Sequence, residues 1–190
     1  MKKTLCSVSL SLLFAVTVFA QGTILWDESV SGSFSQFSAS PTHLVSFQLG
    51  TNTIIGTAEV EPTGPNWAVT PDFFSFQVPG GLLVTAVYLQ INKPNVLHWV
   101  GDTAFANMLA FAQSPTNGNL LSQWGLSSIG TGAYGMDVEN QDAQPFPSIA
   151  NYRLDFFLES VPEPGTLPLL FLGLGLVGLR SSKRIQRNPN

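Results

Sequence analysis

Alternation between apolar and polar side chains is the feature that most limits what this chain can fold into. In residues 151–159 the even-numbered positions are apolar and the odd-numbered ones are polar, with Phe157 the exception. Residues 72–78 repeat the pattern, with two phenylalanines and a valine on one face. A period of two is typical of a strand that is buried on one face. No segment of useful length shows the helical period, so the sequence predicts an all-β domain.

Further strands are expected where apolar residues cluster between turn sequences. Residues 82–91 form a nearly continuous apolar run, which predicts a strand buried on both faces. The other expected strands are residues 23–26, 43–49, 53–60, 104–113 and 133–139. Segments rich in Gly, Pro and Asn separate them, at residues 50–52, 64–66, 79–81 and 114–118.

About eight short strands at this spacing predict an antiparallel β-sandwich or jelly-roll-like domain over residues 21–160. Residues 115–133 are rich in Gly, Ser and Asn and are expected to form a long surface loop. There is no repeat of fixed period, which argues against a solenoid or a propeller.

The first 20 residues have the three parts of a secretory signal peptide. Lys2 and Lys3 are followed by an apolar stretch over residues 9–19, and cleavage is expected after Ala20. The single cysteine of the chain, Cys6, lies in this segment. The exported chain would therefore contain no disulfide, cysteine nucleophile or cysteine-ligated metal, and its stability would come from packing.

Charge is distributed unevenly along the chain. Residues 21–160 contain eleven Asp and Glu but only two basic residues, Lys93 and Arg153, which gives a formal charge of −9. A surface this acidic repels phosphate backbones, so nucleic acid is excluded as a partner.

Residues 161–190 form a tail with three parts. Pro162, Glu163 and Pro164 make a stiff, extended segment, because proline fits neither a helix interior nor a central strand. Residues 167–179 are apolar and predict a transmembrane helix. Such a helix would be roughly 20 Å long, against a hydrocarbon core of about 30 Å, so it would be a marginal anchor. A basic cluster follows, which holds that end in the cytoplasm: Arg180, Lys183, Arg184 and Arg187.

The Pro162-Glu163-Pro164 motif, the Gly-rich apolar stretch and the basic end together resemble the PEP-CTERM tail, a segment also catalogued as an ice-binding protein C-terminal domain. The resemblance implies sorting by an exosortase, a membrane enzyme of Gram-negative bacteria that make extracellular polysaccharide. The alternative that the residues leave open is a plain C-terminal membrane anchor that is not processed.

The middle of the chain resembles the bacterial pre-peptidase C-terminal sandwich domain. The resemblance rests on a Gly-Thr strand at residues 49–57 and on an Asp-x-Phe-x-Phe-x-Val-Pro-x-Gly hairpin at residues 72–80. Asp27-Glu28, Phe105 and residues 152–156 are similar to what exosortase-sorted relatives carry. Members of that family are accessory modules, which implies a domain without catalytic activity.

The sequence offers no evident catalytic set. His43 and His98 are far apart in the sequence, and His98 lies in an apolar run where a buried histidine with satisfied hydrogen bonds is expected. No serine occupies a Gly-x-Ser-x-Gly elbow. We therefore expect no enzyme activity and no cofactor.

Two kinds of ligand site are weaker candidates. Asp137, Glu139 and Asp142 could supply oxygen ligands to calcium, although they lack the spacing of a calcium loop. Trp26, Trp67, Trp99 and Trp124 could stack on sugars if the fold brought them together.

Taken together, the two ends and the middle predict an exported structural or interaction protein of the cell surface or the extracellular matrix. Signal peptidase and exosortase are the expected processing partners, and extracellular polysaccharide is a candidate ligand. The precursor is expected in the inner membrane of a Gram-negative bacterium, and the product in the envelope or biofilm matrix. The alternative is a carbohydrate- or calcium-binding matrix module.

Overall fold

A computed structural model describes residues 22–63, 66–113, 116–142 and 147–161. The expected signal peptide, the Pro162-Glu163-Pro164 motif, the apolar segment 167–179 and the basic cluster lie outside these residues. Within the described ranges, no helix is long and apolar enough to cross a membrane.

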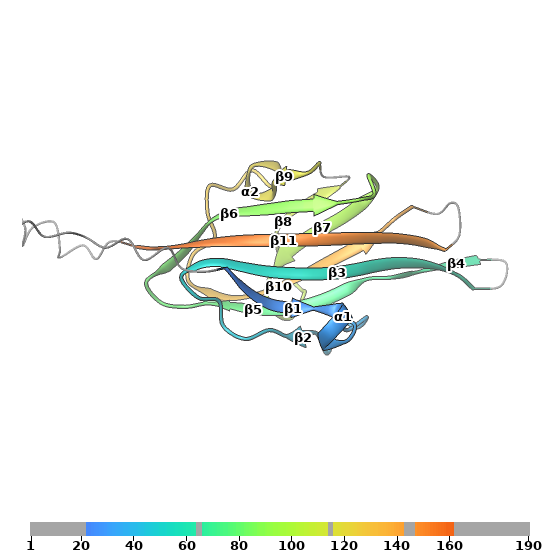
Figure 1. The fold of residues 1–190 in the computed structure, drawn as a ribbon, viewed down its shortest axis with the longest axis horizontal. Coiled ribbons are helices and arrows are strands. Elements are labelled where there is room, and N and C mark those ends of the chain that lie inside the picture. Colours follow the sequence, from blue (N-terminus) through green and yellow to red (C-terminus); the bar gives the residue numbers. More distant parts are fainter. Residues whose placement is uncertain (1–21, 64–65, 114–115, 143–146, 162–190) are drawn as a thin grey trace, which may run out of the picture.

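The strands form two sheets (Figure 1). Sheet A has the order β1-β3-β11-β6-β9, with β4 paired to β3, and consists of β1 (Thr23–Asp27), β3 (Gly50–Thr63), β4 (Asn66–Thr70), β6 (Leu82–Ile91), β9 (Gly118–Asn119) and β11 (Ser148–Ser160). Sheet B has the order β2-β5-β10-β7-β8 and consists of β2 (Thr42–His43), β5 (Asp72–Val78), β7 (Val96–Gly101), β8 (Met108–Gln113) and β10 (Gly132–Asn140). Two helices of one turn each complete the described elements, α1 (Glu28–Ser31) and α2 (Leu120–Gln123).

The two sheets bury their inner faces against each other. Phe156 of β11 and Phe76 of β5 meet with ring centroids 5.3 Å apart, and Phe47 packs against both, at 4.9 and 4.6 Å. Phe47 comes from the segment that runs beside β5, because its amide donates to the carbonyl of Gln77. Aromatic pairs at such distances add to the gain from burying their area. This cluster joins sheet A to sheet B.

The all-β prediction is confirmed, but the antiparallel assignment is wrong at two edges. β1 pairs with β3 in parallel, and β2 pairs with β5 in parallel. Both sheets are therefore mixed. The described residues contain eleven strands rather than about eight, because β4, β7 and the two-residue strand β9 were not predicted.

The predicted bounds of 72–78 and 82–91 coincide with β5 and β6, but β6 is not buried on both faces. Val84, Val87 and Leu89 face the core, whereas Tyr88 is 46% exposed and Gln90 is exposed. The outer face of sheet A is open to solvent at β6, so this strand is less buried than its apolar sequence predicted.

Three other segments also differ from the sequence predictions. Residues 44–49 are not a regular strand, although the amides of Leu44 and Phe47 still donate to carbonyls of β5. Strand β8 begins only at Met108, because residues 102–107 form a tight loop. The expected surface loop 115–133 contains α2 and contributes buried side chains to the core, namely Leu120, Leu121, Trp124 and Ile129.

One side chain from sheet A reaches a carboxyl of sheet B through the interior. The Tyr152 hydroxyl of β11 donates to Oδ2 of Asp72 of β5 at 2.8 Å, and both residues are buried. Gly56 lies opposite Tyr152 on β3, where any Cβ would overlap the Tyr152 ring. The absence of a side chain at residue 56 therefore makes room for this contact.

Candidate functional site

A row of four side chains crosses the outer face of sheet B. Phe111 on β8 pairs with Trp99 on β7, Trp99 pairs with Asp137 on β10, and Asp137 pairs with Phe73 on β5. Trp99 alternates with buried residues His98 and Val100, so its side chain points away from the core. The register of four strands thus places one carboxyl group between aromatic residues on both sides.

A loop between β7 and β8 adds a fourth aromatic ring beside this row. Phe105 stacks on Trp99 with centroids 5.2 Å apart and meets Phe73 edge-on at 5.1 Å. Its φ is 54°, a left-handed conformation that is unfavourable for a bulky residue. The Asp102 carboxylate holds the loop by accepting hydrogen bonds from the amides of Ala106 and Asn107.

Two glycines allow the rings to lie close to the sheet. Gly135 of β10 and Gly101 of β7 are cross-strand neighbours. A Cβ on Gly135 would lie 2.7 Å from the Asp102 carbonyl and 2.8 Å from the Phe105 ring. One on Gly101 would overlap the Asn107 carbonyl and lie 2.8 Å from the Trp99 ring. The loop backbone and the aromatic rings therefore occupy the space that two side chains would otherwise fill.

These residues surround a hollow of about 440 Å³, which we call the aromatic groove. Its lining consists of Ser38, Phe73, Trp99, Phe105, Ala106, Met108 and Asp137. A volume of this size is within the range of small-ligand sites, and aromatic and apolar side chains combined with a few polar groups, here Ser38 and Asp137, are typical of them.

Asp137 is the charged group in the lining of the aromatic groove. Burial raises its pKa to about 7, and the negative charge of Glu139 adds to this, while a hydrogen bond from the backbone of Trp99 opposes it. Its Oδ1 atom is enclosed and accepts no hydrogen bond from the described residues. A buried carboxyl oxygen without a partner is costly, and a positively charged group in the groove would offset that cost.

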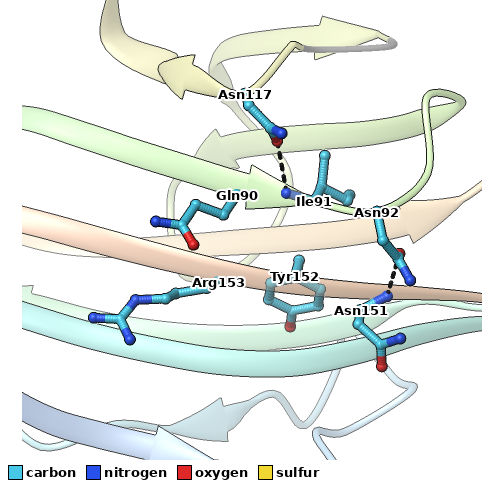
Figure 2. A pocket seen from close by; sticks show the side chains of 7 residues that line it. All are labelled: Gln90, Ile91, Asn92, Asn117, Asn151, Tyr152 and Arg153. Atoms are coloured by element: carbon cyan, nitrogen blue, oxygen red, sulfur yellow. Dashed lines mark hydrogen bonds between the residues drawn. The ribbon is translucent and has the colours of Figure 1, made fainter.

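A second hollow, of about 470 Å³, lies on the outer face of sheet A (Figure 2). It is lined by Gln90, Ile91, Asn92, Asn117, Asn151, Tyr152 and Arg153. Figure 2 shows the side chains of Asn117 and Asn92 bonded to the backbone amides of Ile91 and Asn151. The Asn117 and Asn92 Oδ1 atoms accept these hydrogen bonds at 2.7 and 2.8 Å. The side-chain oxygens of these two residues hold the ends of the strands and are already engaged.

Arg153 in this second hollow is also engaged internally. Its guanidinium donates to both carboxylate oxygens of Asp155, with Nε 2.9 Å from Oδ2, and to the Thr53 hydroxyl. The second hollow therefore offers fewer free groups than the aromatic groove.

A third hollow, of about 330 Å³, is acidic and includes Glu28, Glu59 and Asp72 in its lining. Burial raises the pKa of Asp72 to about 8, and the negative charge of Glu28 raises it further, while the hydrogen bond from Tyr152 lowers it. Burial also raises the pKa of Glu28. In the part of the chain that the structure describes, no three His, Asp or Glu side chains are placed to hold a metal ion.

The calcium candidates are only partly brought together. Asp137 and Glu139 lie on the same face of β10, two residues apart. Asp142 lies beyond the end of that strand and forms an ion pair with Lys93 at 3.9 Å. Calcium binding by these three residues stays a prediction, and the geometry favours it less than the aromatic groove favours an organic ligand.

The tryptophans do not form one platform. Trp26 donates its indole N–H to the carbonyl of Gly32 and stacks on Phe34, and Trp124 is buried in the core. Trp99 lies in the aromatic groove, and the side chain of Trp67 is outside the described residues. Sequence reasoning singled out Trp99 and Asp137 for different reasons and did not connect them.

His98 is more deeply buried than expected. It is fully enclosed, and neither ring nitrogen has a hydrogen-bond partner within the described residues, so the expected satisfied histidine is not found. Burial lowers its pKa to about 3, and its ring meets Tyr152 edge-on. His43 bonds through Nδ1 to the Ser75 hydroxyl at 2.5 Å.

Residues 160–184 match the family model described as the PEP-CTERM protein-sorting motif. The chain therefore carries the sorting signal of an exported, exosortase-processed protein, as its tail predicted. No curated protein matches the chain in sequence.

Two solved structures are similar to the described domain at low identity. One is the pre-peptidase C-terminal domain of a collagenase from Bacillus anthracis, with 15% identity, a TM-score of 0.37, and coverage of 62% of this chain and 93% of that domain. The other is PliG, a periplasmic inhibitor of g-type lysozyme from Salmonella Typhimurium, with 12% identity, a TM-score of 0.36, and coverage of 62% and 99%.

Proposed function

We propose that this chain is a structural or interaction protein of the cell envelope or extracellular matrix, delivered there through its sorting tail. The observation that carries the proposal is the match of residues 160–184 to the PEP-CTERM motif. An exported precursor would be held in the inner membrane by residues 167–179 and released when exosortase acts near Pro162-Glu163-Pro164. The β-sandwich of residues 21–160 would then be the part that remains outside the cell.

The composition and the fold support a role without catalysis. His43 and Ser75 form a base–hydroxyl pair among the described residues, but neither lines any of the three hollows, and His98 is enclosed. The acidic surface would keep the domain soluble among other acidic polymers. A carbohydrate- or calcium-binding role stays the alternative, and a glycan array and a calcium titration of the exported protein would test it.

Replacing Pro162, Glu163 and Pro164 together by alanine is expected to stop processing without stopping export. The signal peptide is untouched in this variant, and the short apolar segment would still hold the chain in the membrane. The precursor should accumulate in the inner membrane. Fractionation followed by intact mass spectrometry measures this, and the released wild-type protein should lack residues 167–190.

Replacing Lys183 and Arg184 by glutamine provides a matched control in the same tail. It leaves Pro162-Glu163-Pro164 and two basic residues of the cluster in place, so release should continue. A released wild-type protein that retains the whole tail would contradict processing and identify a plain membrane anchor.

A further inference from the structure

We propose that the aromatic groove binds an organic ammonium group, which lies against Phe73, Trp99 and Phe105 and is held by the charge of Asp137. The biological setting of such a ligand rests on the proposed function, that of a non-catalytic interaction domain. The binding itself is a property of the groove.

The aromatic rings of the groove favour a cationic ligand. Trp99, Phe105 and Phe73 come from three different segments and converge on one hollow, with Met108, 53% exposed, also in its lining. The faces of aromatic rings carry negative potential and attract ammonium groups within about 6 Å of the centroid. A ring that stacks on its neighbour, as Phe105 does on Trp99, is held in place before the ligand arrives.

The charge at the groove also favours a cation. Asp137 lines the hollow, Glu139 lies two residues away on the same face of β10, and the lining contains no basic residue. Because Oδ1 of Asp137 is enclosed without a partner among the described residues, a cation nearby would favour the ionised form of this carboxyl and compensate its charge. A neutral sugar could stack on the same rings but would not provide this compensation.

The backbone of the loop beside the groove is strained at Phe105. The loop accepts a left-handed phenylalanine at residue 105, where glycine would be free of strain, and Asp102 fixes the loop around it. Strain of this kind persists where the surrounding structure enforces it, and it is concentrated at ligand sites. It is explained if the Phe105 ring is needed to close one side of the groove.

The experiment measures binding of choline to the purified exported protein by calorimetry at constant ionic strength. The neutral isostere 3,3-dimethylbutan-1-ol, methylammonium and methyl glucoside are measured under the same conditions. We expect choline to bind at least roughly tenfold more tightly than its neutral isostere, since cation–π attraction and the carboxylate both act on the charge. Weaker binding by methylammonium would reflect its smaller contact with the rings.

Three variants test the residues. Asp137→Asn keeps the shape of the side chain and should weaken choline binding at least roughly tenfold, while the isostere is unaffected. Phe105→Gly should also weaken choline binding while the domain stays folded, because relief of the left-handed strain offsets part of the lost contacts with Trp99 and Phe73. Phe157→Ala is the matched control, since Phe157 belongs to an exposed aromatic pair with Tyr88 on sheet A and should leave choline binding unchanged.

Several results would overturn the proposal. These are equal binding of choline and its isostere, tighter binding of methyl glucoside than of choline, or unchanged choline binding in both Asp137→Asn and Phe105→Gly. Absence of choline binding at millimolar concentrations would overturn it as well. None of these outcomes bears on the processing of the tail, which the Pro162-Glu163-Pro164 variant tests separately.

Discussion

The exported protein is expected to be most stable at mildly acidic pH and to lose stability as the pH rises toward 8. Asp72 is the main cause. It is 4% exposed, and its pKa in the folded state is about 8 against an ordinary value of 3.8. Asp137 acts in the same direction, with a folded-state pKa of about 7.

The direction follows from which state holds the proton. Between pH 3.8 and about 8 the folded state keeps a proton on Asp72 that the unfolded state has released. A raised pKa of this kind stabilises the fold below the unfolded value and loses that contribution as the pH rises through the folded value. The free energy of unfolding then falls by about 1.4 kcal/mol per pH unit for each such proton.

His98 acts in the opposite direction at lower pH. Its pKa is lowered from 6.5 to about 3, so the unfolded state binds a proton that the folded state excludes within this interval. Its contribution is present above pH 6.5 and is lost as the pH falls toward 3. Together the three groups place the maximum of stability at acidic pH, and the loss on raising the pH is steepest once His98 no longer opposes the two carboxyls.

Melting temperature measured from pH 4 to 9 at constant ionic strength tests this expectation. The Asp72→Asn variant keeps an acceptor for the Tyr152 hydroxyl and removes the titration, so its curve should be flatter between pH 4 and 8. A wild-type protein that melts at a higher temperature at pH 8 than at pH 5 would show that the buried carboxyls do not hold their protons.

Gly56→Ala is expected to destabilise the domain by about 3 kcal/mol or more, because a methyl group would overlap the Tyr152 ring. Moving that ring would also break the hydrogen bond from its hydroxyl to Asp72, which leaves a buried carboxyl without its partner. Since β3 and β11 are central neighbours in sheet A, the backbone cannot shift there without loosening both. The melting temperature should fall by roughly 10 °C.

Gly130→Ala provides the matched control for this substitution. A Cβ on Gly130 would meet nothing within 4 Å, and the same methyl group should change the melting temperature little there. Equal effects of the two substitutions would show that backbone freedom, rather than the space beneath Tyr152, determines the role of Gly56.

The sequence predicted the strands whose two faces differ in polarity. β5 and β11 alternate between apolar inner and polar outer positions over most of their length, with Asp72, Phe73 and Phe157 among the exceptions, so their faces could be assigned from the sequence. β7 escaped prediction because Leu97 and Trp99 on its outer face are as apolar as Val96 and Val100 on its inner face. The parallel edges could not be foreseen either, because strand direction depends on where a segment returns to the sheet.

The aromatic groove needed the register of strands that are distant in sequence. Phe73, Trp99 and Asp137 lie on β5, β7 and β10, and only their pairing brings them into one row. In the sequence, Asp137 is recognisable only as an acidic residue near Glu139, and such a pair suggests a metal site rather than an aromatic one. The left-handed conformation of Phe105 has no signature in its own residue type, since glycine or asparagine would be expected there.

The sorting motif begins directly where the central strand of sheet A ends. Ser160 still pairs with Leu82, and the amide of Val161 donates to the carbonyl of Gly81 at 2.8 Å, immediately before Pro162. β11 is flanked on both sides, by β3 and by β6. A pulling force on the tail would therefore be directed along β11, and its hydrogen bonds to two neighbours would bear the load in shear, all at once rather than one by one. A domain held through this end would resist unfolding under force, and a force applied to the domain would be transmitted along β11 to the point of attachment.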